Sequence, residues 1–235
     1  MSQRVRVAAF DAVGGPSKLA KADDGFYAGP TDAGTYRISH CGQHSSPSYP
    51  VWSKIRWGSA IKEEGGTILV MHGGKWQPLS TLSPTLTRAD LVHRNTQLYG
   101  KAELPATWVF NDFGHITCYF YNDKNGNGRL DKDLGERIHT EYFHTTPNDE
   151  AADAAGKPVS LSPSHGCIHL KPKDIDELIA KGYFKAGNKV VVHRYSESVT
   201  AWELAAAAAV PFEVHFFPGA EQVIVTGRRP NGAGR

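Results

Sequence analysis

Long apolar segments, a surplus of one charge and a dense set of cysteines are all missing from this chain of 235 residues. No apolar run approaches the roughly 18–20 residues that a helix needs to cross a bilayer. The 26 basic and 24 acidic residues leave a formal net charge of +2, and they form no dense Lys/Arg stripe of the kind found in nucleic-acid-binding proteins. These absences argue against a membrane span and against a nucleic-acid partner, and they favour a globular chain.

The N-terminal residues also lack the apolar segment of a secretory signal peptide. Arg4 and Arg6 are basic, but no hydrophobic region follows them. We therefore expect that the protein stays in the cytosol, leaves it by a route that needs no such signal, or is a mature form with an added methionine.

The three cysteines are Cys41, Cys118 and Cys167. An odd number leaves at least one thiol free if the other two are bridged. A Cys41–Cys118 disulfide is one alternative. The other, which buried cysteines generally favour, is two unconnected thiols in the core.

Short runs bounded by Gly and Pro predict a mainly-β (α+β) protein with flanking helices. The predicted strands lie over residues 5–12, 35–40, 67–71, 108–110, 115–121, 137–144, 189–194 and 212–217. Asn111–Gly114 has the composition of a hairpin turn, and residues 148–157 read as a polar loop. Thr87 is expected to cap a helix that runs to Leu98, and a second helix is expected over Lys173–Lys181.

Composition shifts after residue 196. Ser198–Val210 contains five consecutive alanines and predicts a helix with Ser198 as its N-cap. A short strand and a flexible tail are expected to follow. The sequence therefore predicts a main domain over residues 1–196 and a C-terminal appendage over residues 197–235.

The stretch SPSHGCIHL over Ser162–Leu170 places Cys167 between two histidines. Its polar, turn-forming neighbours suit an exposed site at the start of a strand better than a buried structural thiol. In an extended strand His165, Cys167 and His169 would share one face, so zinc binding by a non-enzymatic module is one alternative. A redox role lacks the C-x-x-C partner that it would need.

The other alternative is that Cys167 is a catalytic nucleophile. A thiol attacks as its thiolate, so it needs a base that the fold brings near. The upstream histidines His115, His139 and His144 are available for this role.

SHGCIHL over Ser164–Leu170 resembles the signature S/T-H-G-C-h-R/N-L of the L,D-transpeptidase family, the YkuD-type catalytic domain of bacterial cell-wall enzymes. That family carries an upstream histidine at a strand end, in a segment h-H-G-T/S. Here Tyr142–Thr146 reads YFHTT, which matches His144 to the family's base. Pro30–Tyr36 and Asp174–Leu178 resemble the family's strand entry and following helix more loosely.

The resemblance implies a YkuD-like β-sandwich or barrel over residues 1–196 and acyl transfer through a thioester. Cys167 would attack, His144 would act as base with His139 as fallback, and the backbone carbonyl of Thr145 would hold the base in its tautomer. Gly166 and Cys167 would offer backbone N–H groups to the oxyanion. His165 would shape the pocket.

Ser164, His169 and Tyr142 are expected to contact substrate. His169 stands where the family usually has Arg or Asn, a residue that orders the site or holds substrate carboxylates. This departure affects the expected form of the substrate more than the chemistry.

The implied partner is a peptidoglycan stem peptide, and the products are those of L,D-transpeptidation or L,D-carboxypeptidation. No cofactor is required by such chemistry. The implied location is the bacterial envelope or periplasm, and an exported antibacterial effector with the same chemistry is an alternative. The acceptor and the oligomeric state stay open.

A second motif, DKNGNGRLD over Asp123–Asp131, matches the first nine positions of an EF-hand calcium loop. Asp123, Asn125, Asn127 and Asp131 supply oxygens at positions 1, 3, 5 and 9, and glycine stands at position 6. Leu134 occupies position 12, where a bidentate Glu is expected. Calcium binding is therefore one prediction, and a polar hairpin loop rich in Asn and Gly is the alternative.

Overall fold

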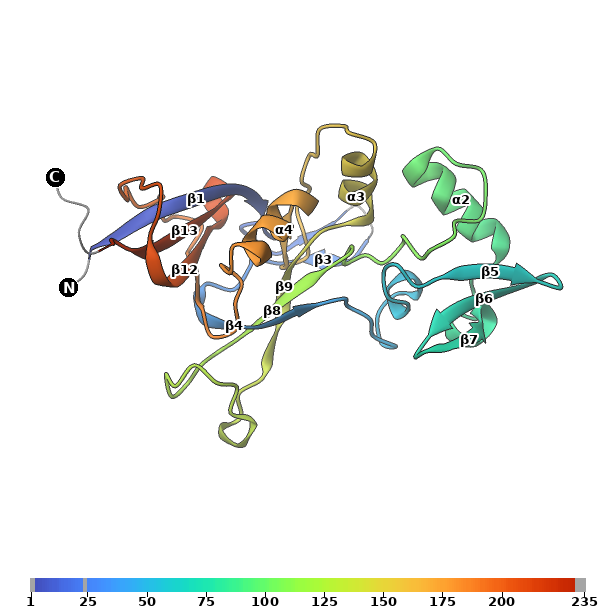
Figure 1. Cartoon of the computed structure of the whole chain (residues 1–235), viewed down its shortest axis with the longest axis horizontal. Coiled ribbons are helices and arrows are strands. Elements are labelled where there is room, and N and C mark those ends of the chain that lie inside the picture. The colour runs from blue at the N-terminus through green and yellow to red at the C-terminus, as the bar shows by residue number, and fades with distance from the viewer. Residues whose placement is uncertain (1–2, 23–24, 231–235) are drawn as a thin grey trace. The chain divides into compact units, whose positions relative to one another are not determined.

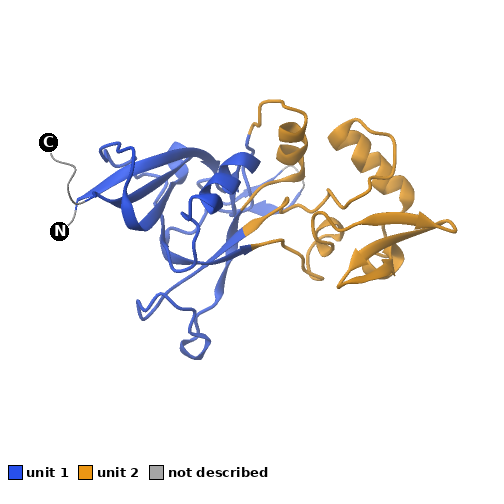
Figure 2. Cartoon of the chain, viewed as in Figure 1, with its two compact units in different colours: residues 1–41, 118–143, 161–235 blue, residues 42–117, 144–160 orange. Residues whose placement is uncertain are grey.

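The chain folds into two compact units, each made of segments that are distant in the sequence (Figure 2). The structure is a computed structural model that describes residues 3–22 and 25–230. Unit 1 comprises residues 1–41, 118–143 and 161–235, and unit 2 comprises residues 42–117 and 144–160. The division between the two units does not fall at residue 196, where the sequence predicted a domain boundary.

Unit 1 is built on a closed barrel in which strands follow the order β1-β10-β9-β8-β4-β11-β12-β13. Figure 1 labels six of these strands, β1, β4, β8, β9, β12 and β13. Unit 1 also contains a hairpin of two short strands and, separately, one helix. The strands are β1 (Arg4–Val13), β4 (Gly34–Gly42), β8 (Thr117–Tyr121), β9 (Ile138–His144), β10 (Ile168–Leu170), β11 (Lys189–Val192), β12 (Ala209–Phe217) and β13 (Gln222–Arg228), with β2 (Ala20–Lys21), β3 (Tyr27–Ala28) and α4 (Pro172–Ala180) beside them. The mainly-β prediction is confirmed.

Alternation along the strands fills the barrel. In β11, Val190 and Val192 are buried while Val191 between them is half-buried, as expected for side chains that point to opposite faces. Phe120 and Phe143, from β8 and β9, are fully buried and meet edge to face with ring centroids 5.6 Å apart. Aromatic packing of this kind fixes the strand pair that leads to the Cys167 segment.

The predicted Ala-rich helix over residues 198–210 does not form. Residues 198–208 contain no helix, and Ala209 already belongs to β12. β12 pairs in parallel with β11 and antiparallel with β13, so it closes the barrel instead of forming an appendage. Five alanines are too few to sustain a helix in water, and the barrel pairing outweighs their propensity. In the region where a flexible tail was predicted, the strand β13 extends to Arg228. Residues 231–235 lie outside the described part of the chain.

Unit 2 contains a three-stranded meander, the helices α1 and α2 and the 3₁₀ helix η1 (Val51–Lys54) around a core of its own, and also the helix α3. The elements are β5 (Ile61–Glu64), β6 (Thr67–His72), β7 (Lys75–Pro78), α1 (Leu79–Leu82), α2 (Arg88–Tyr99) and α3 (Pro147–Ala154). Val70, Leu91 and Trp108 are among the fully buried residues of its core. Thr87, the predicted cap of α2, forms a capping box with Asp90, which satisfies two N–H groups that the first turn leaves open.

Two local predictions are wrong. Residues 148–157 were expected to be a loop, but α3 begins there because Thr146 accepts from the N–H of Asp149 and Pro147 occupies the first turn, a favoured start. The expected hairpin around Asn111–Gly114 is absent, since Thr117–Tyr121 is a strand and residues 108–110 are not. The side chain of Asn111 instead caps loop carbonyls at His44 and Ile55.

Cys41 and Cys118 form a disulfide between the neighbouring strands β4 and β8. Of the two alternatives that the sequence left open, the bridge is therefore the one observed. Cys167 is the free cysteine. Among the described residues, no helix has both the length and the apolar character to cross a membrane.

Candidate active site

Cys167 lies in unit 1, directly before β10, the strand between β1 and β9. The turn that presents it is closed by one hydroxyl: Ser164 Oγ donates to the carbonyl of Cys167 and accepts the N–H of Gly166 at 3.0 Å. The N–H of Ser164 in turn donates to the carbonyl of Gly14 at 3.0 Å. Ser164 is buried, so its hydroxyl shapes the turn, whereas the sequence predicted that it contacts substrate.

Glycine is required on both sides of this turn. Gly166 has φ +141°, and a Cβ there would lie 3.0 Å from Oε1 of Glu141. A Cβ on Gly15 would lie 3.1 Å from the backbone N of Gly166. Residues with a side chain rarely adopt this φ and would collide here. The turn thus lies close to the side chain of Glu141 on β9 and to the backbone that follows β1.

The thiol of Cys167 is protonated at rest. Burial raises its pKa to about 12, a backbone hydrogen bond from Tyr142 lowers it, and the nearby Glu141 carboxylate raises it. A thiol with such a pKa is almost wholly un-ionised at neutral pH. Attack by Cys167 therefore requires a base to take the proton in the reaction itself.

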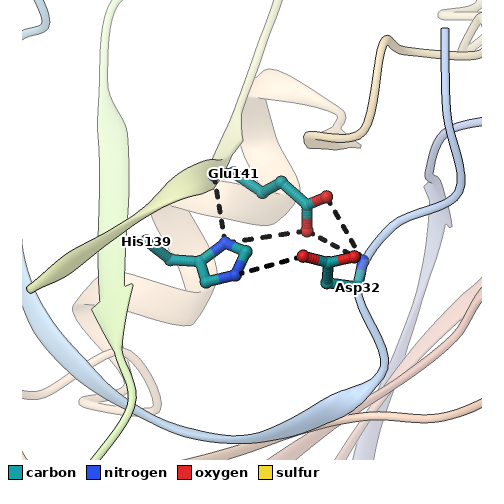
Figure 3. Close-up of side chains that lie close together, drawn as sticks. All are labelled: Asp32, His139 and Glu141. Atoms are coloured by element: carbon teal, nitrogen blue, oxygen red, sulfur yellow. Dashed lines mark hydrogen bonds and ion pairs between the residues drawn. The ribbon is translucent and has the colours of Figure 1, made fainter.

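Three titratable side chains from two segments of unit 1 meet beside this turn (Figure 3). Both carboxylate oxygens of Glu141 accept the N–H of Asp32, at 3.2 and 3.0 Å. His139 Nε2 lies 3.5 Å from Oδ2 of Asp32, and its Nδ1 accepts the N–H of Glu141 at 3.2 Å. Their ligand atoms all lie within 4.8 Å of one another, and no other such group of His, Cys, Asp and Glu occurs in the described part of the chain.

The sequence did not predict the roles of Asp32 and Glu141. One signal was present: His139 and Glu141 are two residues apart in a strand, which places both on one face. Nothing in the sequence linked that face to Asp32, which comes from the segment before β4. Burial lowers the pKa of His139, so the ring is neutral at pH 7, and burial raises the pKa of Glu141 to about 7. The cluster can accept a proton and can hold a cation.

Glu141→Gln is expected to remove a pH-dependent loss of stability. Because burial raises the pKa of Glu141 from 4.5 to about 7, the folded state binds this proton more tightly than the unfolded state. The contribution of this proton to the free energy of unfolding is fully present below about pH 4.5 and is lost as the pH rises through about 7. A shift of this size corresponds to a free energy of unfolding on the order of 3 kcal/mol.

Urea unfolding at about pH 5 and about pH 8.5, either side of that pKa, measures this effect. Between these pH values the wild type should lose more stability than Glu141→Gln. Glu221→Gln, an exposed carboxyl of the same unit, should behave as the wild type. Equal losses in all three proteins would show that Glu141 ionises normally.

His144 is the last residue of β9 and lies at the start of a segment of unit 2. Its ring is buried, and Nδ1 lies 2.7 Å from the carbonyl of Thr145. Since a carbonyl only accepts, Nδ1 carries the proton and Nε2 is the basic nitrogen. A proton on Nδ1 is the tautomer that the resemblance implied, and the roles of His144 and Thr145 stay predictions.

The residues after His144 are held in place by contacts within unit 2. Thr145 Oγ1 donates to the carboxylate of Glu150, which also contacts Nδ1 of His115 at 2.5 Å. Gly114, with φ +60°, leaves room for that hydroxyl, because a Cβ at Gly114 would overlap Thr145 Oγ1. The ring of Phe113 lies 4.8 Å from that of His144. His115, one of the histidines considered as a base, is thus part of the support for Thr145.

The remaining predicted residues of the motif have structural contacts. His165 is exposed, and its carbonyl accepts the N–H of Gly29. His169 is buried, and its Nδ1 lies 2.8 Å from the carbonyl of Ser162. Burial lowers the pKa of His169, so it is neutral at pH 7 and cannot bind a substrate carboxylate as a cation. Tyr142 contacts the ring of Tyr119 at 4.8 Å and bonds Cys167 through its backbone.

His165, Cys167 and His169 were the alternative zinc ligands. In the structure their donor atoms do not all lie within 4.8 Å of one another. The strand begins only at Ile168, and the φ of Gly166 breaks the alternation that would have put all three on one face.

The predicted calcium ligands lie in unit 1, in the connection between β8 and β9. The side-chain amides of Asn125 and Asn127 each donate to Oδ2 of Asp131 at 2.6 Å. Asp123 contacts Arg37 on the neighbouring strand β4 at 3.0 Å. These residues are separate from the turn that holds Cys167.

Comparison with known proteins gives one match. The family model of the L,D-transpeptidase catalytic domain, YkuD, matches residues 4–192. No curated protein and no solved structure gives a significant match.

Proposed function

Because the chain belongs to the L,D-transpeptidase catalytic-domain family, YkuD, over residues 4–192, we propose that it transfers acyl groups of peptidoglycan stem peptides through a thioester on Cys167. Family membership implies that the substrate is peptidoglycan and that the protein acts in the cell envelope. The observation that carries the proposal is the free thiol of Cys167, held in a glycine turn before β10.

The first half-reaction forms the acyl-enzyme. Sγ of Cys167 attacks the carbonyl of an L-centred residue that precedes a D-amino acid, while Nε2 of His144 takes the thiol proton. The C–N bond of the tetrahedral intermediate then breaks, and the leaving D-amino acid receives that proton on its amine. In support, β9, which ends at His144, and β10, which follows Cys167, are neighbours in the barrel.

In the second half-reaction an acceptor attacks the thioester. An amine yields a new amide and water yields a free acid, and in both cases the thiol of Cys167 is regenerated. The ratio of the two products distinguishes a transpeptidase from a carboxypeptidase.

The oxyanion of the tetrahedral intermediate needs a fixed donor. Of the two N–H groups that the sequence suggested, that of Gly166 already donates to Ser164 Oγ. We therefore assign the role to the N–H of Cys167. Ser164 then acts by fixing the turn and not by binding substrate.

Incubation of the whole protein with tetrapeptide stem muropeptides tests this function. We expect loss of the terminal D-residue, or its exchange when a D-amino acid is added, as seen by mass spectrometry of the peptides. Cys167 is the one free thiol among the three cysteines, so protein in which this thiol is fully alkylated, as verified by intact mass, should not react. Intact stem peptides after prolonged incubation with equimolar protein would contradict the proposal.

A further inference from the structure

The connection between β8 and β9 contains a buried carboxylate oxygen without a partner. Oδ2 of Asp123 accepts from Nε of Arg37 and from the N–H of Gly128, each at 3.0 Å. Oδ1 of the same side chain is buried and has no hydrogen-bond partner, and only 6% of the side chain is exposed. A buried anionic oxygen that lacks any donor is unfavourable, so this atom calls for a ligand.

Three further oxygen-bearing side chains gather in the same connection. Asn125 and Asn127 both reach Oδ2 of Asp131 at 2.6 Å. Their amide oxygens accept the N–H groups of Asn127 and Arg129, and each oxygen keeps a second lone pair. The side-chain oxygens of this connection therefore belong to carboxylates and amides, which are the ligands that a hard divalent cation prefers.

Glu136 holds the connection together through two backbone N–H groups. Leu134, at the twelfth position, is exposed. A single 3₁₀ turn over Lys132–Leu134 and the left-handed Gly135 carry the chain back into the connection. Glu136 is 1% exposed there, and its two oxygens accept the N–H groups of Lys124 and Asp131 at 2.7 and 2.8 Å.

We propose that the segment Asp123–Asp131 binds one calcium ion, with Oδ1 of Asp123 as a direct ligand and the side-chain oxygens of Asn125, Asn127 and Asp131 as further ligands. Oxygen donors without His or Cys favour calcium over zinc or copper. The ion would hold together the first part of a 16-residue connection whose far strand, β9, carries His139 and Glu141. Calcium would then stabilise the strand that borders the Cys167 turn, independently of the acyl-transfer proposal.

Calorimetric titration of the whole protein with calcium tests this site. We expect saturable binding of one ion per chain, with a Kd of about 10⁻⁵–10⁻³ M, and a rise in Tm with calcium. Asp123→Asn and Asp131→Asn should weaken binding at least about tenfold, as expected when a charged ligand is lost. Asp133→Asn removes the same charge from an exposed residue of the same connection and should bind as the wild type.

Circular dichroism and Tm in EDTA establish that each variant is folded before it is titrated. If Asp123→Asn does not fold, Asp131→Asn and Asn125→Ala carry the test, with the same expected weakening. No saturable binding up to about 10 mM calcium, ten times the weakest Kd expected, would overturn the proposal. So would equal affinity in the wild type and in the folded ligand variants.

Discussion

Cys167→Ala is expected to lose at least about 10⁴-fold in the rate of stem-peptide conversion, which is the loss typical for removal of a nucleophile. The chain has no other thiol to take its place, because Cys41 and Cys118 are bridged. The measurement is the rate of release or exchange of the terminal D-residue under single-turnover conditions. Alanine fits the site without a clash because it lacks only the sulfur atom.

A structural role for Cys167 would give a different pattern. If the thiol only packed against its neighbours, Cys167→Ala would lower Tm and leave the rate per folded molecule nearly unchanged. We expect the opposite, with similar Tm and no detectable turnover. Cys167→Ser serves as the matched variant, since it keeps the shape and should also be inactive because a serine hydroxyl ionises far less readily than a thiol.

His144→Gln is expected to lower the conversion rate by about 10²–10⁴-fold, the usual cost of losing a general base. Because the pKa of Cys167 is raised to about 12, only on the order of 10⁻⁵ of the thiol is ionised at pH 7 without assistance. The variant should therefore depend on free hydroxide. Its rate should rise about tenfold per pH unit through the alkaline range, whereas the wild-type rate should level off once His144 is deprotonated.

The matched control for that result is His139→Gln. His139 was the fallback base of the sequence analysis, and in the structure it bonds Asp32 and the backbone of Glu141. We expect His139→Gln to keep the wild-type pH plateau and to lose less than about tenfold in rate, since it sits outside the proton transfer. A lost plateau in His139→Gln, with His144→Gln unaffected, would reverse the assignment of the base.

Local sequence signals predicted those features that depend on local chemistry. The capping box of Thr87 and Asp90 fixed the start of α2 in both sequence and structure. The motif around Cys167 identified the free thiol, and the neighbouring position of Thr145 matched its carbonyl to Nδ1 of His144. Each of these depends on residues within a few positions of one another.

Features that depend on pairing between distant segments were missed. Ala209 becomes part of a strand because it pairs with Arg228 of β13, and no property of the alanines reveals that neighbour. Asp32 joins His139 and Glu141 only because the segment before β4 passes the face of β9. Glu136 is buried in the connection between β8 and β9 because a 3₁₀ turn over Lys132–Leu134 and the left-handed Gly135 direct the chain back into it, and motif spacing alone does not show this.

The most direct test of the central claim is the intact mass of the protein after brief mixing with a tetrapeptide stem muropeptide. The account predicts a mass increase equal to the acyl portion of the peptide without its terminal D-residue. Digestion should locate the added group on the peptide that contains Cys167, and Cys167→Ala should show no increase. Conversion of the stem peptide with no adduct on Cys167, and with undiminished rate in Cys167→Ala, would contradict the account.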